Sequence, residues 1–264
     1  MNQLIIVKIG GNIVDDDSSL QNFLKSFASI NQAKILVHGG GKLATKMAET
    51  MGVQQQMVDG RRITDGETLK VVTMVYAGYI NKNIVAQLQQ YGANAIGLSG
   101  ADANAILAHK RKGKTTQGID YGFVGDIDQV NVAFFNGLIK QSLVPVVSPI
   151  THDGNGQLLN TNADTIAQSI ATAMSSFYET ILVYSFEKKG VLLDINHDDS
   201  VIPIIDSNYY QTLKAKQQIF AGMIPKLDNA FTAIEQGVSK VIIGNAAELD
   251  QLIIGKAGTT IQNG

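Results

Sequence analysis

Short apolar runs, many of them β-branched, alternate along the chain with longer amphipathic stretches. The apolar runs predict strands at Leu4–Ile9, Lys34–His38, Ala95–Leu98, Leu143–Ser148, Thr180–Tyr184 and Lys240–Ile243. The amphipathic stretches predict helices at Ser18–Ile30, after Gly41 to about Met51, and at Asn162–Met174, with one long helix or two abutting helices at Thr64–Tyr91. Strands that alternate with helices are typical of a mostly parallel sheet covered on both faces. We therefore expect an α/β fold.

Three local signals refine this prediction. Thr64-Asp65-Gly66-Glu67 has the form of a capping box and should open the long helix. Between Ala103 and Asp128 the sequence is polar and glycine-rich, which favours hairpin-like turns over helix, and Asp153–Gly156 predicts a turn. A lobe boundary near Ser175-Ser176 would give lobes 1–175 and 176–264, although one continuous sheet could run through it.

Composition narrows the class of protein. The chain has 264 residues, 45% of them apolar and 17% charged, which is enough to bury a sizeable core. A formal net charge of -2 gives no electrostatic reason to expect a nucleic-acid or anionic membrane partner. Neither a membrane-length apolar run nor the pattern of a signal peptide is present, so we expect a cytoplasmic protein.

The residue types in the sequence give little reason to expect a metal site or redox chemistry. The chain has no cysteine, which rules out disulfides and thiolate metal sites. Its four histidines are scattered without metal-ligand spacing, so we assign no metal-binding residue. Gly113-Lys114-Thr115 resembles the end of a Walker A loop, but Ala108 stands where the loop needs its first glycine. No dinucleotide-binding glycine motif follows a predicted strand.

Candidate chemistry lies where predicted strands end in glycine or a small polar residue. Lys8 falls inside an otherwise apolar strand that ends at Gly10-Gly11. A buried ammonium is costly unless an anion pairs with it. Lys8 therefore either reaches past the strand end to a phosphate or lies on an edge strand and extends to solvent. The two interpretations are about equally supported by spacing alone.

Further motifs of the same kind follow. Three glycines, Gly39 to Gly41, join a predicted strand to a helix, and such a loop favours anion binding over a plain connector. Asn160 and Asp164 flank Asn162, which could be a helix N-cap. Lys226 follows Pro225 on the first turn of a predicted helix, where a solvated lysine would be the ordinary interpretation.

Together, these motifs resemble the amino acid kinase family over nearly the whole chain, and they occur in the family's order. They are Lys8–Gly11, His38–Gly41, Asp59–Thr64, Gly97–Asp102, Asn160–Asp164 and Gly222–Lys226. The resemblance implies a three-layer αβα sandwich like that of carbamate kinase. It also implies an N-terminal lobe for the amino-acid substrate and dimerisation, a C-terminal lobe for ATP, and a homodimer.

The resemblance implies roles for matching residues. Lys8 and Lys226 would stabilise the transferred phosphoryl group and Asp164 would organise both lysines. Arg62 would bind the substrate's α-carboxylate with its bidentate fork, Asn160 its amino-acid part, and the Gly40 and Gly41 amides the phosphate and the acceptor carboxylate. The nucleotide-binding residues would be Gly10, Gly11, Glu187, Gly190, Val191, Leu192, Phe220 and Met223.

The implied activity is transfer of the γ-phosphoryl group of MgATP to the side-chain carboxylate of N-acetyl-L-glutamate, in arginine biosynthesis. A carboxylate with a reference pKa of about 4.3 is already deprotonated at neutral pH and needs no general base. It needs positive charge, glycine-loop amides and in-line positioning. The lack of an obvious catalytic base in the sequence therefore agrees with this activity.

The chain departs from the family pattern in three places. Phe186-Glu187-Lys188-Lys189 replaces the usual residues near the nucleotide, and Ala101 stands where a lysine is common. The chain also begins at its first strand, so we expect no feedback inhibition by arginine through an N-terminal helical extension.

Alternative functions remain open at the level of sequence. The acyl group could be succinyl, and the acceptor could be N-acetylaminoadipate, glutamate, aspartate or a nucleoside monophosphate. A non-catalytic amino-acid or nucleotide sensor on the same fold is a more distant alternative. Such a sensor should have lost one of the two phosphate-site lysines, and both Lys8 and Lys226 are present.

Overall fold

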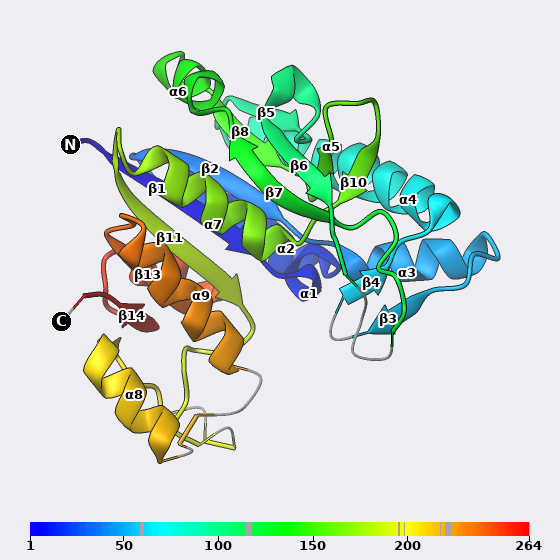
Figure 1. Ribbon diagram of the computed structural model, residues 1–264. Helices are drawn as coiled ribbons and strands as arrows, with labels where there is room; N and C mark the ends of the chain where they lie inside the picture. Colours follow the sequence, from blue (N-terminus) through cyan, green and yellow to red (C-terminus); the bar gives the residue numbers. More distant parts are fainter. Residues whose placement is uncertain are drawn as a thin grey trace.

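The centre of the fold is an eight-stranded sheet (Figure 1). The computed structural model describes residues 1–58, 61–113, 118–194, 196–197, 199–216, 218–219 and 223–263. The strands of the sheet are, in spatial order, β12 (Ile204–Ile205), β14 (Thr259–Ile261), β13 (Lys240–Asn245), β11 (Glu179–Phe186), β1 (Gln3–Ile9), β2 (Ala33–His38), β8 (Val144–Val147) and β5 (Ala95–Leu98). All neighbouring pairs are parallel except β13 and β14. The predicted mostly parallel sheet is confirmed.

Alternation along each strand divides the core into two layers. On β1, Leu4 and Ile6 belong to one buried apolar cluster, whereas Ile5 and Val7 belong to the other. This is the period-2 pattern of a strand covered on both faces. One cluster is covered by α6 (Val132–Lys140), α7 (Ala163–Met174), α8 (Ser207–Ala215) and α9 (Ile224–Glu235).

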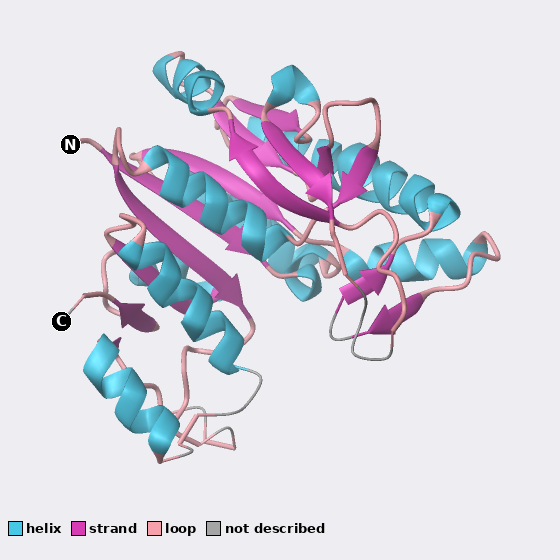
Figure 2. Cartoon of the chain, in the orientation of Figure 1, coloured by secondary structure: helices cyan, strands magenta, loops and turns pink. Residues whose placement is uncertain are grey.

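The other cluster lies under a second set of helices, so the three-layer αβα sandwich is confirmed (Figure 2). They are α2 (Asp17–Ser29), α3 (Gly41–Thr50), α4 (Gly66–Thr73), the π-helical segment η1 (Met74–Ile80), α5 (Asn81–Gln90) and α10 (Leu249–Ile253). The other described helical segments are short: α1 (Gly11–Val14), η2 (Asp102–Asn104) and η4 (Ala246–Glu248).

A smaller four-stranded sheet lies beside the main one (Figure 1). Its order is β10 (Leu158–Asn160), β9 (Ile150–His152), β6 (Ile106–Lys110) and β7 (Gly125–Val130). The antiparallel pair β6–β7 confirms the hairpin character predicted for 103–128, and β9 and β10 flank the predicted turn at 153–156. A further hairpin joins β3 (Gln56–Val58) to β4 (Arg61–Ile63).

The predicted capping box is wrong by one residue. Asp65, not Thr64, caps α4, because its carboxylate accepts from the Thr68 N–H at 2.7 Å. Thr64 instead bridges to Gly122 and belongs to the extended segment that precedes the helix. The capping-box pattern fails here because a second good N-cap residue follows the first directly.

The main sheet continues across the predicted lobe boundary. β1 pairs with β2 on one side and with β11 on the other, so strands from before and after residue 175 share one set of backbone hydrogen bonds. Among the described residues, no helix has both the length and the apolar character that crossing a bilayer requires.

Candidate active site

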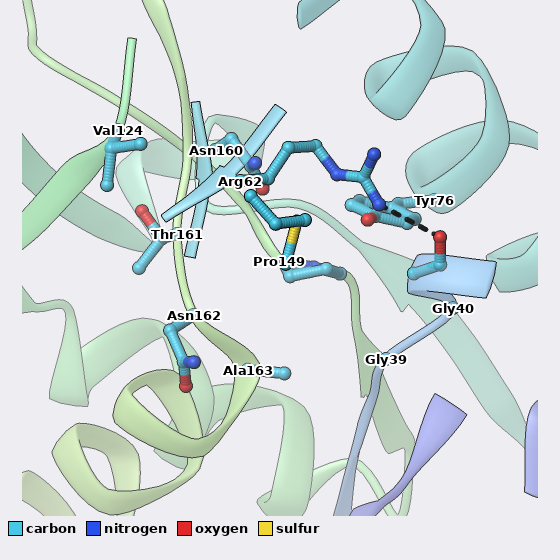
Figure 3. Close-up of a pocket in the computed structure, with 12 residues that line it drawn as sticks. Gly39, Gly40, Arg62, Tyr76, Val124, Pro149, Asn160, Thr161, Asn162 and Ala163 are labelled. Carbon is cyan, nitrogen blue, oxygen red and sulfur yellow. Dashed lines mark hydrogen bonds between the residues drawn. The ribbon is translucent and has the colours of Figure 1, made fainter. Parts of the chain in front are cut away.

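A cavity of about 220 Å³ opens at the carboxyl ends of the central strands, beside the N-termini of α3 and α7 (Figure 3). Its lining residues are Gly39, Gly40, Gly41, Met57, Arg62, Tyr76, Val124, Pro149, Asn160, Thr161, Asn162 and Ala163. Open α/β sheets bind their ligands at this edge. Four residues predicted to bind substrate, Gly40, Gly41, Arg62 and Asn160, therefore line a single cavity.

Two glycine turns meet next to this cavity. The Gly39 N–H donates to the Ile9 carbonyl at 3.2 Å, which ties the end of β2 to the end of β1. A Cβ on Gly11 would lie 3.6 Å from the Gly40 nitrogen and 3.5 Å from the Gly41 nitrogen. It would also lie 3.9 Å from an Asp15 carboxylate oxygen. Glycine at position 11 thus leaves room for an anion to approach these N–H groups.

The Lys8 ammonium is paired inside the fold. Its Nζ lies 2.8 Å from the Asp164 carboxylate, and the Lys8 side chain is 17% exposed. Because β1 lies between β2 and β11, the edge-strand interpretation of Lys8 is wrong. The predicted link between Lys8 and Asp164 is present, and it joins the central strand to the first turn of α7.

The position of Asp164 is set by local helix capping. Asn162 is the N-cap of α7, as predicted, and its side chain accepts from the N–H groups of Asp164 and Thr165. This fixes the first turn of the helix over the end of β1. The Tyr184 hydroxyl, 3.4 Å from the Asp164 carbonyl, contacts the same turn, and burial raises the pKa of Tyr184.

Arg62 lies on β4 and extends towards Tyr76 and α3 (Figure 3). One of its terminal nitrogens donates to the Gly41 carbonyl and to the Thr45 hydroxyl, both at 2.9 Å. The other donates to the Gln55 side chain. The guanidinium is thus held against the first turn of the helix that follows the glycine loop. Burial raises the pKa of the Tyr76 hydroxyl, and the nearby Arg62 charge opposes this shift.

Asn160 is held at the end of β10. Its side-chain amide donates to the Thr64 hydroxyl at 3.0 Å, and its backbone N–H donates to the Phe123 carbonyl at 2.9 Å. Thr64 in turn donates to the Arg62 carbonyl at 3.0 Å. Arg62 and Asn160, nearly a hundred residues apart in sequence, are therefore connected through one buried threonine.

Of the predicted nucleotide residues, Gly10 and Glu187 lie at the end of β11. The Gly10 N–H donates to the Ser185 carbonyl at 3.1 Å, next to Phe186. The Lys226 ammonium lies 4.7 Å from the centre of the Phe186 ring, a cation–π distance, and Met223 precedes the same helix. The Glu187 side chain is exposed, and its carbonyl accepts from Asn245.

Gly190, Val191 and Leu192 are packed against the edge of the sheet. The Val191 N–H donates to the Thr259 hydroxyl at 2.8 Å, and a Cβ on Gly190 would lie 2.8 Å from the same oxygen. The Val191 and Leu192 side chains are buried, and the Val191 carbonyl accepts from the Ile202 N–H at 2.9 Å. Phe220 lies outside the described residues, as do Asp59, Gly60 and Gly222.

Several cavity residues were not predicted from the sequence. They are Met57, Tyr76, Val124, Pro149 and Thr161. Pro149 and Thr161 closely follow β8 and β10, so their position after a strand was a usable signal. Tyr76 gave none, because an aromatic residue within an amphipathic helix is ordinarily a core residue.

The fold and the site define a class: an α/β protein with lysines and glycine turns at the carboxyl ends of its parallel strands. The model of the amino acid kinase family matches residues 3–245. The chain belongs to the amino acid kinase family.

Individual relatives agree over nearly their full length. The chain is 56% identical over 253 residues to acetylglutamate kinase of Cytophaga hutchinsonii, covering 96% of this chain and 95% of that protein. It is 54% identical to acetylglutamate kinase of Phocaeicola vulgatus, with 94% and 96% covered.

Solved structures support the fold. The smu.665 protein of Streptococcus mutans superimposes with a TM-score of 0.78 at 27% identity, covering 99% of each chain. Carbamate kinase of Giardia gives a TM-score of 0.70 at 12% identity, covering all of this chain and 99% of that one. At that identity the likeness shows the fold alone.

The glycine loop yields a stability prediction. Gly40 has a φ of 142°, and a Cβ there would overlap the Cδ1 of Ile80, whereas a Cβ on Gly41 would find its nearest neighbour at 3.8 Å. Gly40→Ala should lower the free energy of unfolding by about 1–3 kcal/mol. Gly41→Ala, the matched control, should change it by less than about 0.5 kcal/mol. Urea denaturation of the two variants is the measurement, and equal stability would contradict the strained loop.

Proposed function

We propose that the chain is an ATP-dependent kinase that transfers the γ-phosphoryl group of ATP to the γ-carboxylate of N-acetyl-L-glutamate. The observation that carries this proposal is the convergence of Arg62, Asn160 and the Gly40-Gly41 turn on one cavity, with the Lys8–Asp164 pair beside it. The relatives named acetylglutamate kinase, at more than 50% identity, favour this acceptor over the other family substrates.

The proposed phosphoryl transfer requires positive charge near the transferred group and correct placement of the acceptor. A carboxylate acceptor is already ionised, so the barrier comes from bringing it against an anionic phosphoryl group. In our proposal the Lys8 and Lys226 ammonium groups offset the negative charge that spreads over the transferred group. Asp164 holds Lys8 in place at 2.8 Å, so that little reorganisation is needed during the reaction.

The acceptor would be oriented from two directions. Arg62 would donate to its α-carboxylate, and Asn160 would donate to or accept from its acylamino group. Met57, Val124 and Pro149 provide an apolar wall of the same cavity for the acyl methyl group. The backbone amides of Gly40 and Gly41 would then bind oxygens of the acceptor carboxylate and of the γ-phosphate.

The residues present suit a nucleotide that brings its own Mg²⁺. The space in front of the Gly40 and Gly41 amides is one that a Cβ on Gly11 would fill, as a phosphate cradle requires. Mg²⁺ commonly takes one or two carboxylates together with substrate phosphates. Among the described residues, no group of three His, Asp or Glu side chains is arranged around a metal position. Phosphate oxygens would therefore supply most of the ligands, and the ion would offset phosphate charge.

The proposal includes the lobe roles and a homodimer, both expected from the family resemblance, and the cytoplasmic location expected from the sequence. On η1, the apolar side chains of Met74 and Tyr79 are 51% and 65% exposed, a surface that a second copy could cover. Light scattering should then give twice the 28.3 kDa of one chain. A monomer at micromolar concentration would contradict the proposed dimer and would leave the proposed reaction unaffected.

The acceptor is tested with MgATP and a panel of compounds. ADP release should occur with N-acetyl-L-glutamate and remain at background with free glutamate, N-acetyl-L-aminoadipate and UMP. N-succinyl-L-glutamate belongs in the panel because the proposed contacts of Arg62 and Asn160 do not distinguish an acetyl from a succinyl chain. Turnover with the succinyl compound alone would replace the acetyl acceptor. Folded, ATP-binding protein that is silent with every acceptor would leave the sensor alternative.

Lys8 gives the second test. Lys8→Ala should lower kcat by at least about 100-fold, because it removes a preorganised charge from the transition state. Lys70→Ala is the control, since Lys70 is 69% exposed and pairs only locally with Glu67. Calorimetric titration with ATP should show that the Lys8→Ala protein still binds nucleotide. A variant with kcat near the wild-type value would remove Lys8 from the mechanism.

A further inference from the structure

His38 is the last residue of β2, and its ring is fully buried. Its Nδ1 lies 2.8 Å from the carbonyl oxygen of Gly39, the first glycine of the loop. Its Nε2 lies 3.2 Å from the side-chain nitrogen of Asn81, which is also fully buried. The proposed mechanism gives neither residue a role.

The hydrogen bonds of Asn81 determine the tautomer of His38. The Asn81 side-chain nitrogen also donates to the Val146 carbonyl at 3.0 Å, so this atom must be the NH₂ group. The His38 Nε2 therefore faces a donor and must accept. The ring proton then lies on Nδ1, which donates to the Gly39 carbonyl. Burial lowers the pKa of His38 to about 4, so the ring is neutral at physiological pH.

A bond to the Gly39 carbonyl also orients the next amide. The Gly39 carbonyl and the Gly40 N–H belong to one planar trans peptide, in which they point in opposite directions. Holding the carbonyl towards His38 turns the Gly40 N–H away from the imidazole. The Gly40 nitrogen is one of the three atoms nearest the place a Gly11 Cβ would take, with the Gly41 nitrogen and an Asp15 carboxylate oxygen. Glycine alone would leave this peptide free to rotate.

The π-helical segment η1 brings Asn81 to this position. In a π-helix each N–H bonds to the carbonyl five residues back, so side chains five apart lie more nearly above one another than in an α-helix. Tyr76 and Ile80 pack against Gly40, and Asn81, five residues after Tyr76, contacts His38. The glycine loop is thus held from one side by a single helical face.

We propose that His38 and Asn81 are positioning residues that fix the Gly39–Gly40 peptide with its N–H directed at the transferred phosphoryl group. The inference rests on the proposed phosphoryl transfer for its effect on turnover. The geometry of the pair does not depend on that reaction. Neither residue touches substrate, and both act through the Gly40 amide.

The first experiment tests the geometry without substrate. ¹⁵N NMR of histidine-labelled protein should show the buried His38 ring neutral, with its proton on Nδ1. The resonance is assigned by its loss in His38→Asn. A proton on Nε2, or a charged ring at neutral pH, would overturn the proposal. This result stands even if no acceptor is phosphorylated, so it separates failure of the pair from failure of the proposed function.

The second experiment uses two substitutions of opposite character. In His38→Asn, the amide nitrogen can take the place of Nδ1 and still donate to the Gly39 carbonyl, whereas His38→Leu has no donor. We expect His38→Leu to lower kcat by about 10- to 100-fold with little change in the KM for the acceptor, because the Gly40 amide acts mainly in the transition state. We expect His38→Asn to recover kcat to within about 3-fold of wild type.

His109→Asn is the control, because His109 is exposed and pairs with Asp128 within the four-stranded sheet. It should leave kcat unchanged. Equal losses of kcat in His38→Asn and His38→Leu at equal thermal stability would overturn the proposal, as would full activity in His38→Leu. If His38→Leu does not fold, the tautomer in wild type and the kcat of His38→Asn still decide the question. In that case, a kcat loss above about 10-fold in folded His38→Asn counts against it.

Discussion

The structure is organised around a lysine ammonium in the most central part of the sheet. Lys8 lies on β1, which has a parallel neighbour on each side and helices on both faces. A charge in such a place is costly unless it is paired. Asp164 provides the partner. Because Asp164 lies in the first turn of α7, the pair holds the N-terminus of this helix over the end of β1. The Lys8 side chain nevertheless remains 17% exposed.

The backbone of the glycine turns after β1 and β2 forms the second part of the site. The turns after β1 and β2 lie close together, because the Gly39 N–H donates to the Ile9 carbonyl and a Cβ on Gly11 would lie 3.5–3.6 Å from the Gly40 and Gly41 nitrogens. Glycine is required at Gly40 by its φ of 142° and by the nearness of Ile80, and a glycine needs outside support to hold one conformation. His38 and η1 give that support from within the core. The glycine loop beside the cavity is thus built from a flexible residue type and is held by well-packed neighbours.

Much of this could be predicted from the sequence, because strand ends and helix starts carry local signals. The central strands, the Asn162 cap and the nearness of Lys8 to Asp164 follow from apolar runs, capping chemistry and the family motifs. Local signals failed where two caps compete, as at Thr64 and Asp65. They also could not reveal the π-helical turn in η1, because no residue type marks an i→i+5 bond. The contacts of Tyr76 and Asn81 depend on that turn, and so they required the structure.

The link between the acceptor side and the phosphate side passes through one residue. Arg62 donates to the Gly41 carbonyl, while the Gly41 N–H borders the space left by Gly11. A carboxylate bound by Arg62 and a phosphate bound by the loop would therefore be placed relative to each other by the covalent geometry of Gly41 and its neighbours. In-line transfer depends on that relative placement to within a fraction of an ångström. A shared backbone residue holds it with less freedom than two separate loops could.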